Sequence, residues 1–112
     1  MANLKLTIAD ICLEAHDNAK KKGFYKKNAN ILEKLALVHS EVSEAVEDYR
    51  NGMMQTYEPT RHKPCGFPIE LADIIIRVCD LAEYLKIDLN EAIIFKMAYN
   101  KTRPYKHGGK KA

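Results

Sequence analysis

The sequence predicts an all-α fold, an antiparallel four-helix bundle-type domain that is completed by oligomerisation. Three observations support this class: strand signals are weak throughout the 112 residues, four segments carry apolar residues at helical spacing, and start or stop signals flank each segment. The length fits one domain, residues 1–112, so the helices are expected to share a single core.

The first two helices have clear boundaries in the sequence. Thr7 with Asp10 three residues later is a capping-box variant that begins the first helix, and the run Lys20-Lys21-Lys22-Gly23 ends it. The second helix follows Asn28-Ala29-Asn30 and ends at Asn51-Gly52. Its apolar residues recur at alternating spacings of four and three, a stripe typical of helix bundles. The stripe comprises Ile31, Leu35, Val38, Val42, Ala45 and Tyr49.

The third helix is separated from the second by a long loop. Residues 52–67 contain two prolines and are too numerous for a simple turn, which indicates a functional role for this loop. Pro68 suits the first position of the third helix, which is predicted to run to about Lys86.

The fourth helix leads into a basic end of the chain. Asp88 with Glu91 caps this helix, and Pro104 ends it. A flexible basic tail, about residues 104–112, is expected to follow. The last twelve residues carry five cations and no acid, although the net charge of the chain is only +3. This distribution predicts an anionic partner for the tail, which could be phosphate, nucleic acid or simply solvent counterions.

The cysteines and the apolar runs indicate a cytoplasmic protein. Cys12, Cys65 and Cys79 form no spaced framework, and an odd number of cysteines favours a reducing compartment. No apolar run is longer than four residues, so no segment is expected to span a membrane.

The third helix carries the most informative polar residues. Glu70, Asp73, Arg77 and Asp80 lie at offsets of three, seven and ten residues and share one strip of a helix that is otherwise apolar. We expect this helix to be buried on most sides, with its carboxylates in a narrow slot. Carboxylates in such a slot repel one another and need a cation, which Arg77 or a metal ion could supply.

The second helix offers the matching half of a site. Glu41 and Glu44 lie one turn apart, and in an antiparallel arrangement they could face Glu70 and Asp73. Four carboxylates suit Mg²⁺, with Mn²⁺ as a possible substitute. A single pair of acids spaced by three residues is more often part of a solvated helix face than of a metal site. That explanation fits Glu70 and Asp73 less well, because their helix is mostly apolar.

These motifs carry a family resemblance. Glu41-x-x-Glu44 followed by Glu70-x-x-Asp73 resembles the signature of the all-α nucleotide pyrophosphohydrolase superfamily, and the terminal YNKTRPYKHGGKK resembles its MazG-like branch. The resemblance covers the chain from about Leu35 to its end.

The resemblance implies a Mg²⁺-dependent enzyme. Such an enzyme hydrolyses a nucleoside triphosphate to a monophosphate and pyrophosphate by attack of metal-activated water at the α-phosphorus. By position, Glu41, Glu44, Glu70 and Asp73 take the catalytic and metal-binding roles. The expected substrate-binding residues are Asn100, Lys101 and Arg103. Members of the family form homodimers or homotetramers.

Several points stay open in the sequence. Many relatives carry a further acid where this chain has Ser40, so the sequence does not determine the number of metal ions. It does not determine the preferred base and sugar either. The loop 52–67 and the first helix are expected to shape the pocket for the base. The alternative function is a non-catalytic helical module that binds nucleotide or nucleic acid. Nucleic acid is the weaker partner, because the tail has few cations and the chain has no known recognition motif.

Overall fold

The all-α class is confirmed in a computed structural model, which describes residues 5–58 and 63–105. Four helices follow one another along the chain: α1 (Ile8–Lys21), α2 (Ile31–Arg50), α3 (Phe67–Tyr84) and α4 (Leu89–Thr102). The described residues form no strand beyond one isolated antiparallel bridge between Tyr57 and Cys65. None of the helices in the described ranges is both long enough and apolar enough to cross a membrane.

Side-chain caps begin three of these helices, and those of α1 and α4 are the predicted ones. Thr7 and Asp10 form the full capping box of α1, with hydrogen bonds of 3.0 and 3.1 Å between side chain and backbone. Asn30 caps α2, and Asp88 caps α4 by accepting from the Glu91 amide at 3.0 Å. These side chains satisfy amide groups that a helix leaves unpaired at its start, which is why the ends follow the sequence signals.

Helix α3 begins at Phe67, one residue before the predicted start, and Gly66 is its N-cap. Gly66 has a φ of 109°, and a Cβ atom there would lie 2.2 Å from the Gln55 carbonyl oxygen. A glycine is therefore required where the loop passes beneath the start of α3. At its other end the helix stops at Tyr84, two residues before the predicted limit, and Lys86 has a φ of 59°.

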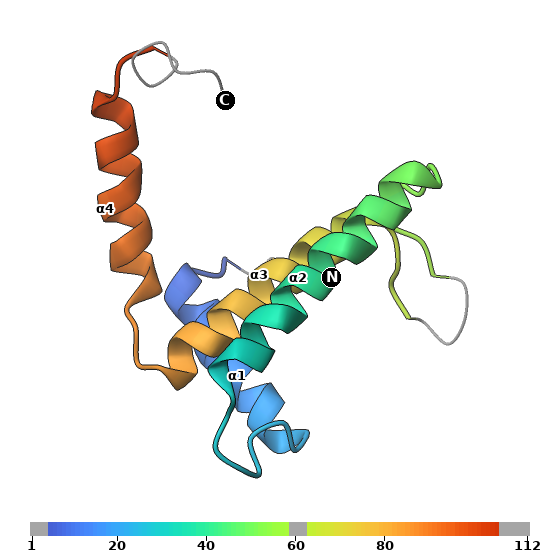
Figure 1. Ribbon diagram of the computed structural model, residues 1–112, viewed down its shortest axis with the longest axis horizontal. Coiled ribbons are helices and arrows are strands. Elements are labelled where there is room, and N and C mark those ends of the chain that lie inside the picture. Colours follow the sequence, from blue (N-terminus) through green and yellow to red (C-terminus); the bar gives the residue numbers. More distant parts are fainter. Residues whose placement is uncertain (1–4, 59–62, 106–112) are drawn as a thin grey trace.

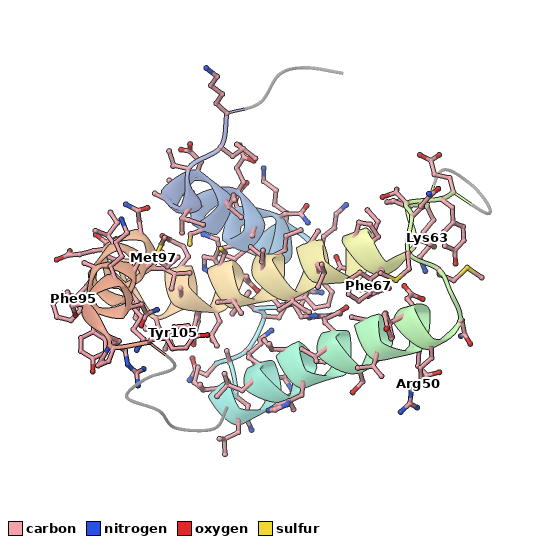
Figure 2. All side chains as sticks on the ribbon, turned by 90° about the horizontal axis from the view of Figure 1, so that it is seen from above. Arg50, Lys63, Phe67, Phe95, Met97 and Tyr105 are labelled. Carbon is pink, nitrogen blue, oxygen red and sulfur yellow. The ribbon has the colours of Figure 1, made fainter. Side chains whose placement is uncertain are left out.

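Helix α3 lies between α1 and α2 and packs against both (Figure 1). Arg50, the last residue of α2, and Phe67, the first of α3, lie at the same end of the molecule, so the two helices are antiparallel as predicted (Figure 2). The small core contains Cys12 of α1 with Cys79 and Ala82 of α3.

Helix α4 is not part of a four-helix bundle within one chain. It projects from the α1–α3 body (Figure 1), where it packs mainly against α1 and where its first residue, Leu89, lies against the core. None of its residues is buried, and Phe95 is 77% exposed. One chain therefore packs three of the four predicted helices together and leaves the fourth largely uncovered.

The predicted apolar stripe of α2 faces the core only in part. Its member Ala45 is buried, as is the neighbouring Glu41, whereas Leu35, Val42 and Tyr49 of the same stripe are exposed. The expectation that α3 is buried on most sides is also wrong for the single chain, since Ile75 is 51% exposed. The acidic side of α2 is the side that contacts α3, and it faces the polar strip of α3.

Candidate functional site

Three of the four predicted acids lie together between α2 and α3. Glu41, Glu44 and Glu70 each offer a carboxylate oxygen, and these oxygens all lie within 4.8 Å of one another. Glu41 and Glu44 are one turn apart on α2, and Glu70 lies in the first turn of α3. The antiparallel packing of the two helices therefore forms the cluster, and we call it the acid cluster.

The acid cluster is graded in its exposure to solvent. Glu41 is buried, with 7% of its surface exposed, Glu70 is half-buried and Glu44 is exposed. The cluster is therefore closed on the protein side and open at Glu44. A ligand could reach it from solvent while the buried end holds it.

Two carboxylate oxygens at the buried end have no hydrogen-bond partner among the described residues. They are Oε2 of Glu41 and Oε2 of Glu70. A buried carboxylate oxygen without a partner is costly, and such oxygens in proteins are normally satisfied by a donor, a water or a cation. The sequence did not single out Asp48, one turn beyond Glu44, whose buried Oδ2 likewise has no hydrogen-bond partner within residues 5–58 and 63–105.

The pKa of Glu70 is raised by burial and by the acids that surround it. Burial raises the pKa of Glu70, and the neighbouring carboxyl groups of Glu44, Asp73 and Glu41 raise it further, to about 7. Like charges at close range and low dielectric favour retention of a proton. Near neutral pH, Glu70 therefore either holds a proton or, once it has lost that proton, can bind another cation.

Asp73 is close to the acid cluster but is not one of the three residues whose oxygens converge. It is half-buried, one turn along α3 from Glu70. Burial raises the pKa of its carboxyl group and the negative charge of Glu41 raises it further, while Arg77 and Lys63 oppose this effect. Asp73 therefore contributes negative charge beside the cluster.

Arg77 fulfils the role of an internal cation. Its Nε donates a hydrogen bond of 2.7 Å to Oε1 of Glu41. Burial raises the pKa of Glu41, but the hydrogen bond and charge of Arg77, together with contacts to Glu44 and Glu70, outweigh burial and lower the pKa overall. Of the two cations considered for this slot, the arginine is thus already in contact with it.

A cavity of about 240 Å³ adjoins the acid cluster and is bordered by α1, α2 and α3. Its polar lining includes Asn18, Lys34, Glu41, Asp73, Arg77 and Asp80. The first helix contributes to this lining, whereas none of the described residues of the loop 52–67 does. Both charge signs occur on its wall, so the cavity suits a ligand with anionic and polar parts.

A second polar group, which sequence reasoning missed, fixes α1 against α3. His16 is buried, and its Nδ1 lies 2.8 Å from Oδ1 of Asp80. Beside His16, the rings of Tyr25 and Tyr84 stack with 4.9 Å between their centres. The Ala29 amide donates a hydrogen bond of 3.2 Å to the Tyr84 hydroxyl. Burial raises the pKa of Tyr25, and the Asp80 carboxylate raises it further. Asp80 is therefore held by His16 and belongs to a structural network.

The predicted substrate-binding residues lie elsewhere in the single chain. Asn100 and Lys101 are in the last turn of α4, and Arg103 caps that helix with its guanidinium 5.6 Å from the centre of the Tyr99 ring. Because α4 leaves the α1–α3 body, one chain does not bring these residues to the acid cluster (Figure 1). The tail from residue 106 onward, with Lys106, Lys110 and Lys111, lies outside the described residues.

Comparisons of the chain with protein families, with curated proteins and with solved structures give no match. The functional argument therefore depends on the residues of this chain.

Proposed function

We propose that this protein is a divalent-cation-dependent nucleoside triphosphate pyrophosphohydrolase, of the MazG-like kind that its sequence motifs resemble. The observation that carries the proposal is the acid cluster. Three carboxylate oxygens converge within 4.8 Å, and two buried oxygens of the same residues have no hydrogen-bond partner in the part of the chain that the structure describes. A single ion could satisfy both features at once.

The donor set fits Mg²⁺, with Mn²⁺ as a substitute. All the converging atoms are carboxylate oxygens, with no sulfur or imidazole nitrogen among them, which favours a hard cation. The exposed position of Glu44 leaves one side open for water and for phosphate oxygens, which Mg²⁺ commonly retains as ligands. When bound, the ion supplies an activated water and neutralises charge on the phosphates.

The protein's own residues have separate tasks in this reaction. Glu41, Glu44 and Glu70 hold the ion, and Asp73 adds negative charge that strengthens its retention. The adjoining cavity receives the nucleoside or part of the triphosphate, with Asn18 and Lys34 as polar contacts. Water attacks the α-phosphorus, the bond from the α-phosphorus to the bridging oxygen breaks, and pyrophosphate leaves with the electron pair of that bond.

A second copy of the chain completes the site in this proposal. Helix α4 has no buried residue, and its apolar side chain Ile94 is exposed. Phe95 and Met97 are exposed along the same helix (Figure 2). The exposed apolar residues of α2 and α3 form a second uncovered surface. Burial of such surfaces between copies favours a homodimer or homotetramer. Packing between copies could then bring Lys101 and Arg103 of one copy to the acid cluster of another.

Subunit complementation tests this arrangement. A Glu41→Gln protein and a Lys101→Ala/Arg103→Ala protein are each expected to be nearly inactive. After they are mixed and allowed to exchange subunits, hydrolysis should return, because some mixed assemblies hold one intact acid cluster served by one intact α4. Light scattering that shows a monomer, or mixtures that stay inactive despite subunit exchange, would contradict the shared site.

The proposed reaction is tested with a panel of purine and pyrimidine nucleoside triphosphates in Mg²⁺. Pyrophosphate should appear with at least one substrate, and chelation of the metal should stop its release. Glu41→Gln should lower the rate at least 100-fold, while Glu47→Gln, an exposed glutamate on the same helix, should leave it unchanged. Release of orthophosphate alone, or of no product from any triphosphate, would refute the proposal; nucleotide binding without turnover would support a non-catalytic module.

A further inference from the structure

Arg77 occupies an unusual position for a residue of a cation site. It follows Glu70 by seven residues and Asp73 by four, so the three side chains share one face of α3. Its contact with Glu41 spans the two helices at 2.7 Å. A positive side chain is thus placed on the carboxylate that lies deepest in the acid cluster.

The contact between Arg77 and Glu41 is asymmetric in burial. The Glu41 side chain is 10% exposed, whereas the Arg77 side chain is 41% exposed. Glu41 cannot leave its place without unpacking α2 from α3. The long arginine side chain can turn about several bonds, and it is more exposed than its partner. The mobile partner of the pair is therefore Arg77.

Arg77 also borders the cavity beside the acid cluster. Among the described residues, Nε of Arg77 forms the hydrogen bond to Glu41, and no hydrogen bond engages the two terminal NH₂ groups of the guanidinium. The planar fork of an arginine matches two oxygens of a phosphate group. The side chain can thus serve either the glutamate on one side or an anion in the cavity on the other.

A divalent ion and the guanidinium would compete for Glu41. Both are cations, and an ion held by Glu41 and Glu70 would repel an arginine that remains within hydrogen-bond distance of the same carboxylate. Arrival of the ion therefore frees Arg77 at the moment when the phosphates of the nucleotide bring negative charge to the adjoining cavity.

We propose that Arg77 is a displaceable counterion, which neutralises Glu41 while the acid cluster holds no divalent ion and turns to bind a phosphate of the nucleotide once the ion is present. This inference rests on the proposed function, because it requires a divalent ion at the acid cluster. It assigns Arg77 opposite effects on the two ligands: the residue weakens binding of the ion alone and strengthens binding of the nucleotide. A residue with only a structural role would not separate the two affinities in this way.

The test compares Arg77→Gln and Arg77→Lys with the wild type by calorimetry at pH 8. The first titration uses Mn²⁺ alone. Arg77→Gln should bind Mn²⁺ about tenfold more tightly than the wild type, because a competing positive charge is gone. Arg77→Lys keeps that charge and should stay within about threefold of the wild type. If Arg77→Gln, which leaves Glu41 without its partner, does not fold, Arg77→Lys still tests the phosphate role in the second titration.

The second titration uses the α,β-methylene triphosphates of deoxyadenosine and deoxyuridine in saturating Mg²⁺, because their α–β bridge cannot be hydrolysed. Both Arg77 variants should bind the better analogue at least tenfold more weakly, since lysine does not reproduce the planar fork. Arg50→Gln is the matched control: Arg50 is an exposed arginine on α2 that pairs with Glu47 at 3.8 Å, and its loss should change neither affinity.

The outcomes separate this inference from the proposed function. If the wild type binds Mn²⁺ at a site that Glu41→Gln abolishes, but Arg77→Gln binds it no more tightly, the counterion role is wrong and the metal site stands. If the analogue binds both Arg77 variants as it binds the wild type, the phosphate role is wrong. If the wild type binds neither Mn²⁺ nor the analogues, the proposed function itself fails.

Discussion

Replacement of Glu70 by glutamine is expected to stabilise the metal-free protein. The neutral amide has the size of the carboxylate but removes its repulsion with the other acids. Burial and the neighbouring carboxyl groups raise the pKa of Glu70 from 4.5 to about 7, which sets an upper limit of about 3 kcal/mol on the penalty for its ionisation. Glu70 is only half-buried, so solvent screening reduces the expected gain to about 1 kcal/mol.

The sign of this effect follows from where Glu70 binds its proton. The folded state holds the proton more tightly than the unfolded state, so the wild type loses stability as the pH rises from about 4.5 through 7. The advantage of Glu70→Gln should therefore be greatest at pH 8 and should narrow as the pH falls to 5. In saturating Mg²⁺ the order should reverse, because an ion present at 100 times its dissociation constant stabilises the wild type by about 2.7 kcal/mol.

Urea unfolding with EDTA or with Mg²⁺, at one fixed protein concentration, measures these differences. A gain of 1 kcal/mol corresponds to a rise of about 4 °C in melting temperature for a domain of this size. Glu47→Gln is the control, because the Glu47 side chain is 65% exposed and outside the acid cluster; its effect should stay within about 0.5 kcal/mol. A less stable Glu70→Gln protein in EDTA at pH 8, or a difference that is the same at pH 5 and pH 8, would refute the reasoning.

Three further predictions concern the site. Mg²⁺ or Mn²⁺ should raise the melting temperature of the wild type by several degrees and should do little for a Glu41→Gln/Asp73→Asn variant; an equal response in both would count against the acid cluster. Hydrolysis in ¹⁸O-labelled water should place the label in the nucleoside monophosphate, whereas label in the pyrophosphate would show attack at the wrong phosphorus. Lys101→Ala and Arg103→Ala should each weaken nucleotide binding about tenfold without a change in Mn²⁺ binding, and unaltered nucleotide affinity would remove them from the site.

Local signals in the sequence predicted the helix boundaries well. Thr7, Asn30 and Asp88 cap their helices in the structure because their side-chain oxygens satisfy nearby amides, an interaction that spans only three residues. The antiparallel arrangement of α2 and α3 was predicted from the acidic residues on both helices. The structure has this arrangement, and Glu41, Glu44 and Glu70 lie together in it.

The packing of the helix faces was harder to predict. Apolar periodicity in α2 predicted one stripe, but only its member Ala45 is buried, whereas Leu35, Val42 and Tyr49 are exposed and Glu41 faces α3. Periodicity shows that a face is apolar and does not show which neighbour covers it. For the same reason, the extension of α4 from the body of a single chain could not be predicted from the sequence.

Long-range polar pairs could not be found from the sequence. His16 and Asp80 are 64 residues apart, and neither belongs to a recognisable motif with the other. Arg77 was a candidate cation for the acidic strip, but only the structure shows its 2.7 Å contact with Glu41. Such pairs depend on how α1, α2 and α3 are positioned, which local spacing does not determine.

Electron paramagnetic resonance of Mn²⁺ tests the central claim most directly, because it counts the free ion as protein is added at pH 8. The wild type should bind Mn²⁺ saturably, Glu41→Gln/Glu70→Gln should lower the affinity more than tenfold, and Glu47→Gln should bind as the wild type does. Equal Mn²⁺ binding by the wild type and the Glu41→Gln/Glu70→Gln protein would show that these carboxylates do not form the ion site.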